Sequence, residues 1–383
     1  MKPAHVVFAG GGTGGHLFPG LAVAARLADD MPKVRITFAG SGKEFERRQV
    51  VAAGFDYLRV SCAPLTGRLR DLPGFVLANL TGYREAKRFL IGQEASVVVG
   101  LGGYASVPMA QAAARRGVPL LLLEQNAVPG RATRWLAPWA TMVCTTFPQC
   151  DDYLPAGCPV RLTGTPIRDG FLGTPHAPRE VGRRTPHAPR EAGPHAEREE
   201  YDAGANLLIL GGSAGARSLN EEVPRALARI RPLLAGWSIV HQSGEADVCR
   251  TQGLYDACGL QALVAAFLGD MPQTLACTRL AICRAGGTTL AELAASGVPA
   301  VLVPYPHAAD DHQRRNAASF AASGGCLVID PRDGRLPLAD RLADILGPLV
   351  ADSRRLIAMS SAIQRLARPA AADEIAAVIR QIA

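Results

Sequence analysis

The chain has 383 residues, 48% of them hydrophobic and 20% charged, which is the composition of a globular protein and enough length for two domains. Its nine cysteines include no C-x-x-C pair, so the sequence predicts neither a zinc knuckle nor a disulfide framework. The net charge of +7, carried mostly by arginine, suits nucleic acid, anionic lipid or diphosphates and does not choose among them.

Short β-branched runs alternate with alanine-rich segments along the chain, a pattern that predicts β–α units around parallel sheets. The strands expected in the first half are 6–9, 34–39, 97–100, 120–124 and 142–144, and the helices are 21–28, 44–53, 107–116 and 131–137. The second half starts again with a strand at 207–210 and a helix at 218–229. Its further strands are expected at 238–241, 263–267, 280–283, 300–303 and 327–329, and its alanine-rich end, 338–383, is expected to be helical.

The two halves open alike, each with a strand that runs into a glycine-rich turn. The strand 6–9 is followed by the turn 10–15, and the strand 207–210 is followed by the turn 211–215. Each unit is a strand, a glycine turn and a helix, which predicts an α/β protein with two Rossmann-like parallel-sheet domains. Between them, the chain is rich in Pro, His, Arg and Glu and holds a direct repeat, so we expect a disordered insertion at 174–200.

The first glycine turn satisfies G-x-G-x-x-G through Gly10, Gly12 and Gly15. The acidic residue that would bind a dinucleotide ribose is missing after the second strand, which argues against an NAD site. What remains is a glycine floor with helix amides directed at it, or simply a tight turn. His16 follows at the expected start of a helix, where it is either a neutral general base or a side chain that hydrogen-bonds the turn.

A second turn with anion-binding character is 283–289, between a strand and the helix that carries Glu292. Its free amides, two hydroxyls and helix dipole suit a diphosphate. Glu292 is placed one turn into that helix, where a carboxylate can accept hydrogen bonds from two neighbouring ribose hydroxyls. The alternative is ordinary capping of the helix by Thr288 or Thr289.

Polar residues also follow other predicted strands. The segments 100–104 and 124–126 come directly after strands of the first half, and together they look like the wall of a single site. In the second half, His307, Asp310 and His312 stand in one polar loop and have the chemistry of metal ligands. The loop offers no spaced acidic partner, which argues against a metal site there.

Together these motifs resemble those of the MurG family of peptidoglycan glycosyltransferases, which convert lipid I to lipid II. The matching segments occur in the family's order and cover nearly the whole chain. They are 11–16 with 19–22, 102–104, 124–130, 164–168, 211–216, 284–292, and His312 and Gln313 with Asn316. The segment Glu124-Gln125-Asn126 is distinctive for the family, whereas a single glycine turn is not. The segment 174–200 departs from the family's pattern.

The resemblance implies a GT-B architecture, two Rossmann-like domains that face each other across a cleft. It implies an acceptor and membrane domain at 1–165, a linker at 166–205 and a UDP-N-acetylglucosamine domain at 206–365, with a last helix near 366–383 that packs back on the first domain. The donor site that it implies consists of Thr13, Gly14, Gly15, Asn126, Arg168, Ser213, Leu268, Gly287, Thr288, Thr289, Glu292 and Gln313.

The resemblance also implies roles for single residues. The backbone of Leu268 meets the uracil, Glu292 the ribose and Gln313 the sugar hydroxyls. His16 deprotonates the acceptor hydroxyl, with Glu124 as the second choice. The acceptor side of the cleft is formed by Gly102, Gly103 and Tyr104.

The expected reaction transfers N-acetylglucosamine from UDP-N-acetylglucosamine to the MurNAc 4-hydroxyl of lipid I with inversion. Such a transfer needs a base for the incoming hydroxyl and stabilisation of the departing diphosphate. GT-B enzymes generally hold the diphosphate with helix N-termini and hydroxyls, and this chain has no D-x-D motif. We therefore expect no metal and no other cofactor, with Ser213 and the turn 286–289 holding the diphosphate.

The acceptor is anchored in a membrane, so the chain has to reach one. No stretch approaches the ~18 apolar residues of a spanning helix, and the N-terminus is too short for a secretory signal. We expect a peripheral protein on the cytoplasmic side of the inner membrane, with possible partner proteins of cell-wall synthesis. The segment 68–80, followed by Arg84, Lys87, Arg88 and Phe89, mixes apolar and basic residues that suit an anionic surface. A core helix with solvated arginines is the alternative.

Other functions fit fewer of these features. Another UDP-sugar transferase or a UDP-N-acetylglucosamine epimerase would share the donor motifs but not the segment 124–130. A nucleotide-sugar sensor would bind the donor without needing His16. An oxidoreductase is disfavoured by the missing acid, and no nucleic-acid partner is expected because the basic residues follow no recognised binding motif.

Overall fold

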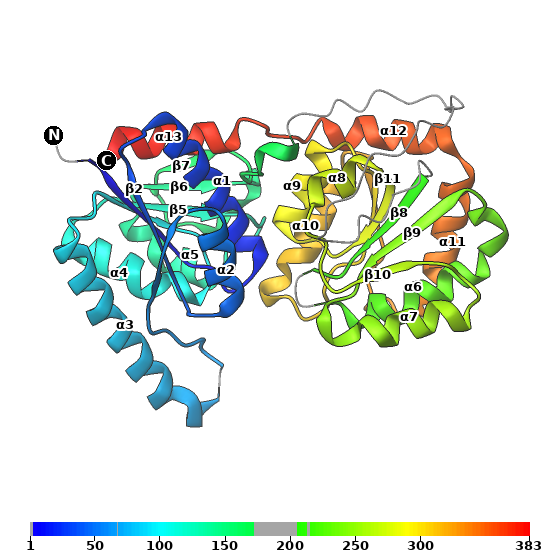
Figure 1. Ribbon diagram of the computed structural model, residues 1–383, viewed down its shortest axis with the longest axis horizontal. Coiled ribbons are helices and arrows are strands. Elements are labelled where there is room, and N and C mark those ends of the chain that lie inside the picture. The colour runs from blue at the N-terminus through cyan, green and yellow to red at the C-terminus, as the bar shows by residue number, and fades with distance from the viewer. Residues whose placement is uncertain (1–2, 67, 172–204, 213–214) are drawn as a thin grey trace, which may run out of the picture.

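The computed structural model describes residues 3–66, 68–171, 205–212 and 215–383. This part of the chain forms two parallel β-sheets, each flanked by helices, that lie side by side along the long axis (Figure 1). The strand orders are β3-β2-β1-β4-β5-β6-β7 and β10-β9-β8-β11-β12-β13. Both contain the doubly wound Rossmann order, so the predicted α/β fold with two such domains is confirmed. The segment 174–200 and Ser213 lie outside the described residues.

The first domain alternates strands and helices. Its strands are β1 (His5–Ala9), β2 (Arg35–Gly40), β3 (Asp56–Arg59), β4 (Val97–Gly100), β5 (Leu120–Glu124), β6 (Met142–Thr145) and β7 (Val160–Leu162). Its helices are α1 (Gly14–Asp30), α2 (Glu44–Ala52), α3 (Leu72–Gly92), α4 (Val107–Arg116) and α5 (Arg131–Leu136).

The second domain repeats this alternation, and the chain ends in three consecutive helices, of which the last, α13, returns to the first domain. The strands of the second domain are β8 (Ala205–Leu210), β9 (Trp237–Gln242), β10 (Leu263–Ala265), β11 (Thr278–Cys283), β12 (Ala300–Leu302) and β13 (Cys326–Val328). The helices are α6 (Arg217–Arg229), α7 (Val248–Ala257), α8 (Met271–Ala276), α9 (Gly287–Ala295), α10 (His312–Ala321), α11 (Leu338–Ala351), α12 (Ser353–Gln364) and α13 (Ala371–Ile382).

The central strands are buried on both faces, which explains their uninterrupted apolar runs. In β1, Val6 and Phe8 pack into a core with α1 and α13, whereas Val7 and Ala9 pack into a core with α3 and α4. The edge strands β3 and β7 are only partly buried, and charged residues interrupt their short sequences. They therefore lack the apolar run by which the other strands were predicted.

The chain crosses between the domains twice, once after β7 and once after α12 (Figure 1). The second crossing brings α13 back to the first domain, where it lies against α1. Ile375 and Ile379 are buried there, and Asp373 forms an ion pair with Arg26. The first domain is thus completed by the last helix of the chain.

Candidate active site

The carboxyl ends of the two sheets face each other, and the glycine turn after β1 meets the turn after β11. The two helices that follow these turns, α1 and α9, lie in contact across the domain boundary (Figure 1). The hydroxyl of Thr288 in α9 donates a hydrogen bond of 2.7 Å to the carbonyl oxygen of Gly15 in α1. The structure therefore brings together two predicted site segments that are far apart in sequence.

The turn before α9 also lies directly against the segment 124–126. A Cβ atom at Gly287 would overlap the carbonyl oxygen of Gln125, so the two backbones approach more closely than any side chain allows. This close approach places the N-terminal amides of α9 beside the polar end of β5.

Asn316 of α10 links the same two segments. It is fully buried, and its Oδ1 accepts a hydrogen bond of 2.7 Å from the amide of Ala127. Its Nδ2 donates to Oδ1 of Asn126 and to the carbonyl of Ala285, each at 3.0 Å. One side chain therefore satisfies backbone groups of both domains, a role that a local sequence pattern does not indicate.

His16 stands in the first turn of α1 and is half-buried. Its Nδ1 lies 3.2 Å from the hydroxyl of Thr13, and its ring lies so close to Gly102 that a Cβ there would be 3.0 Å from Cδ2. Burial lowers the pKa of His16, the nearby Glu124 raises it, and His312 lowers it. The net pKa shift is downward, which leaves the imidazole neutral and able to accept a proton at neutral pH.

Glu124 is buried, and its carboxylate accepts four hydrogen bonds within its own loop. Oε1 accepts from the backbone amide and Nδ2 of Asn126 at 3.1 and 3.0 Å. Oε2 accepts from the amide of Gly130 at 3.0 Å and from the hydroxyl of Thr133 at 2.6 Å. These bonds fix the segment 124–130 and the start of α5, and they leave the charge of Glu124 near His16.

Glu46 of α2 is a site-shaping residue that the sequence analysis did not identify. It is fully buried, and its Oε1 accepts from the amide of Gly12 at 2.6 Å and from the hydroxyl of Ser41 at 2.7 Å. Oε2 accepts from the amide of Ser41 at 2.8 Å and from the hydroxyl of Tyr57 at 2.6 Å. No acidic residue ends β2, and Glu46 in the first turn of α2 binds the glycine turn itself.

Arg168, in the first crossing between the domains, faces Glu292 of α9. The guanidinium of Arg168 lies 4.6 Å from the ring centroid of Phe18, and its Nη2 is 3.8 Å from Oε1 of Glu292. Burial raises the pKa of Glu292 to about 7, although Arg168 opposes this shift. Glu292 stands in the second turn of α9, and the amides at the N-terminus of this helix favour an anionic ligand.

Two further predicted donor residues lie in the second domain, Leu268 in a loop and Gln313 in the first turn of α10. The amide of Leu268 donates to Oε1 of Gln242 at 3.1 Å, and Oε1 of Gln313 accepts from the amide of Tyr305 at 2.9 Å. Gly14 and Thr289 are at the first turns of α1 and α9, and Tyr104 starts a short 3₁₀ turn before α4.

The polar loop before α10 is held by contacts within the protein. Asp310 forms an ion pair with Arg134 of the first domain, and Nδ1 of His312 lies 2.8 Å from the carbonyl of Ala309. Within the described ranges, no group of three or more His, Cys, Asp or Glu side chains is arranged to hold a metal ion.

Comparison with known proteins gives a consistent assignment. Residues 6–145 match the glycosyltransferase family 28 N-terminal domain, and residues 206–375 match the glycosyltransferase family 28 C-terminal domain. A UDP-N-acetylglucosamine--N-acetylmuramyl-(pentapeptide) pyrophosphoryl-undecaprenol N-acetylglucosamine transferase of Syntrophotalea carbinolica is 36% identical over 383 residues, with 98% of each chain covered. The protein of the same description from Pseudomonas fluorescens is 37% identical over 388 residues, with 99% of each covered.

Solved structures agree with this result. The crystal structure of MurG from Acinetobacter baumannii is 30% identical, with a TM-score of 0.71 and coverage of 99% of this chain and 100% of the other. A UDP-N-acetylglucosamine 2-epimerase described as putative, from Listeria monocytogenes, reaches a TM-score of 0.69 at only 13% identity, which shows a shared fold alone. The resemblance drawn from the motifs is confirmed: the chain belongs to the MurG family of glycosyltransferases, within glycosyltransferase family 28.

Proposed function

We propose that the protein transfers N-acetylglucosamine from UDP-N-acetylglucosamine to the MurNAc 4-hydroxyl of lipid I, which gives lipid II. The observation that carries this proposal is the hydrogen bond between Thr288, in the first turn of α9, and Gly15, which directly precedes His16 in the first domain. The contact joins Gly15, the residue before His16, to the N-terminus of α9, which supports a site that combines a base with an anion-binding group.

The donor is proposed to bind with its diphosphate at the start of α9. Backbone amides of Gly287, Thr288 and Thr289 are at the positive end of the helix, and Arg168 adds a cation nearby. Glu292 is proposed to bind the ribose hydroxyls. Ser213 remains an expected diphosphate ligand that lies outside the described residues.

The acceptor hydroxyl is proposed to attack the anomeric carbon of the donor while His16 takes its proton. The bond from that carbon to the phosphate oxygen breaks, and UDP leaves with the electron pair. The amides of α9 and the charge of Arg168 stabilise the negative charge of the departing diphosphate. Glu124 fixes the loop beside His16, and its charge favours the imidazolium that forms.

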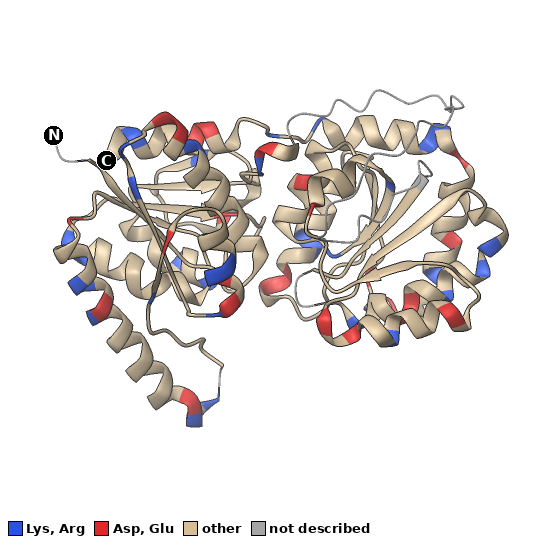
Figure 2. Cartoon of the chain, viewed as in Figure 1, with Lys and Arg blue, Asp and Glu red and all other residues tan. Residues whose placement is uncertain are grey.

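The first domain is proposed to meet an anionic membrane, on the cytoplasmic side, through α3. This helix extends away from the rest of the domain (Figure 1). Its outer half, residues 72–83, has no charged residue, and its inner half carries Arg84, Glu85, Lys87 and Arg88 (Figure 2). The apolar side chains Val76 and Leu77 are 52% and 66% exposed in its outer half. Arg84 and Lys87 are exposed farther along, so an apolar and basic surface is available for an interface. No helix among the described residues has the length and hydrophobicity to span a membrane.

The decisive experiment measures transfer of labelled N-acetylglucosamine to a short-chain lipid I analogue, with a chelator present. Wild type is compared with His16→Ala and His16→Asn, because Asn retains a hydrogen-bonding group but does not act as a base. We expect transfer to fall by at least two orders of magnitude in both variants while UDP binding persists. Tight UDP-sugar binding by wild type without any transfer product would reject lipid I as the acceptor.

A further inference from the structure

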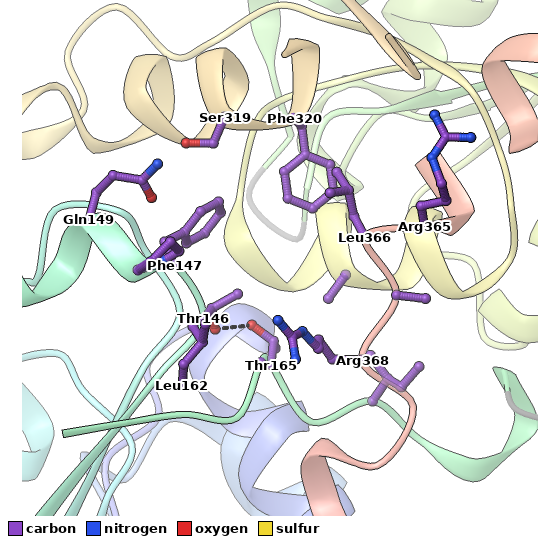
Figure 3. A pocket seen from close by; sticks show the side chains of 15 residues that line it. Thr146, Phe147, Gln149, Leu162, Thr165, Ser319, Phe320, Arg365, Leu366 and Arg368 are labelled. Atoms are coloured by element: carbon purple, nitrogen blue, oxygen red, sulfur yellow. Dashed lines mark hydrogen bonds between the residues drawn. The ribbon is translucent and has the colours of Figure 1, made fainter. Parts of the chain in front are cut away.

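A hollow lies between the domains, on the side where the chain crosses between them (Figure 3). Its volume is about 480 Å³, which is the size of a small-molecule site. Both crossings line it, through Thr165 and Ile167 of the first and through Arg365 and Arg368 of the second. A ligand in this position would touch both connections between the domains at once.

The lining combines apolar rings with unpaired positive charge. Phe147 of the first domain and Phe320 of the second are buried and meet edge to face, with ring centroids 5.9 Å apart. Arg365 and Arg368 are exposed at the rim, and no carboxylate of the described residues forms an ion pair with either. Arg365 donates one hydrogen bond of 3.3 Å, to the carbonyl oxygen of Ser361. Aromatic walls and guanidinium groups that no described carboxylate neutralises together fit an apolar organic anion, such as an aromatic carboxylate or sulfonate.

The cavity lies back to back with the proposed donor site. Ile167 lines the cavity, whereas its neighbour Arg168 lies over Phe18 and faces Glu292. In α9, Ala291 lines the cavity and the next residue is Glu292. The same short segments therefore form one wall of each site, so a ligand that shifts them changes the other site as well.

We propose that this cavity binds a small apolar organic anion and that its occupation changes the affinity for the nucleotide donor. The binding part of the proposal is independent of the reaction assigned above, whereas the coupling part rests on the proposed donor site. Because linkage is reciprocal, the donor must change the affinity for the anion by the same factor.

The test titrates the full-length protein with 1-anilinonaphthalene-8-sulfonate and follows its fluorescence. The variants are Arg365→Gln with Arg368→Gln, which removes the rim charge, and Ser319→Trp, which fills the hollow from α10. Arg354→Gln is the matched control, because this exposed arginine of α12 does not line the cavity. We expect the double arginine variant and Ser319→Trp to bind the probe at least fivefold more weakly, and Arg354→Gln to bind it like wild type. The midpoint of thermal unfolding is expected to be unchanged in all of them.

The coupling is measured as the Kd of UDP at increasing probe concentration, and the reverse titration is made as well. A reciprocal change of threefold or more, without full displacement, supports the proposal. Equal probe binding in wild type and both cavity variants overturns the site, and simple competition with UDP places the probe in the donor site. An unchanged Kd of UDP overturns the coupling. Transfer to the lipid I analogue is assayed separately, so failure of the proposed reaction is distinguished from failure of this site.

Discussion

The hydroxyl of Thr288 donates a 2.7 Å hydrogen bond to the carbonyl oxygen of Gly15, and this bond joins the N-termini of α9 and α1. Two turns that are separated by 273 residues thereby meet. Both helices direct their positive ends toward the junction, which favours negative charge there. His16 follows Gly15 directly, so the position of the proposed base relative to the donor turn depends on this contact.

Replacing Thr288 with Val removes the hydrogen bond to Gly15 with little change in shape. We expect kcat/KM for transfer to fall about 3- to 30-fold, because a typical buried hydrogen bond contributes on the order of 1 kcal/mol and the turn is held less firmly. Thr288→Ser keeps the hydroxyl and is expected to retain most of the activity. Steady-state kinetics of the three proteins test this, and equal loss in the Val and Ser variants would contradict it.

Replacing Glu46 with Gln should destabilise the first glycine turn. Each carboxylate oxygen accepts one backbone amide, from Gly12 or from Ser41, so the amide nitrogen of Gln must face a backbone N–H in either orientation. We expect a loss of about 1–3 kcal/mol in the free energy of unfolding and reduced transfer. Urea denaturation measures the loss. Glu44→Gln, on the exposed face of the same helix, is the control and is expected to change stability by less than about 1 kcal/mol.

Binding of UDP-N-acetylglucosamine should depend on the protonation of Glu292. Burial raises the pKa of this carboxyl group to about 7, so it is ionised above that pH and becomes neutral below it. The ionised form accepts hydrogen bonds from ribose hydroxyls more strongly. We therefore expect KM for the donor to rise as pH falls from 8 to 6, and to lose this dependence in Glu292→Gln. A wild-type KM that is constant across this range would argue against ribose binding by an ionised Glu292.

Charges placed on the outer half of α3 should release the protein from membranes. The double variant Val76→Glu with Leu77→Glu is expected to bind phosphatidylglycerol vesicles at least tenfold more weakly, because burying each apolar side chain contributes about 1.5–3 kcal/mol. Sedimentation with vesicles measures this. Ile357→Glu, at an apolar residue of α12 that is 51% exposed, is the control and should bind like wild type. Similar loss in the control would mean that added negative charge alone explains the effect.

Several elements were predicted closely because their amino-acid pattern follows from their burial and from how they end. The strands β4 and β5 and the helix α4 have the predicted bounds, since burial on both faces selects apolar strands and Gly117 takes a left-handed conformation after the helix. The helix α1 begins at Gly14, before the predicted range 21–28 but close to His16, which was expected at a helix start, because its first turn is the glycine turn itself. Glycine and proline there gave no helical pattern, although the packing of α1 keeps those residues helical.

The sequence by itself determined two parallel sheets with a glycine turn after the first strand of each, because these features depend on local apolar runs and on backbone conformations that glycine permits. It also indicated that His16 and Glu292 stand near such turns. Only the tertiary structure decided that Thr288 contacts Gly15, that Asn316 binds both domains and that Glu46 holds Gly12. These contacts join side chains to backbone groups far away in the chain. A backbone amide or carbonyl is the same at every residue, so the sequence around it carries no record of its partner.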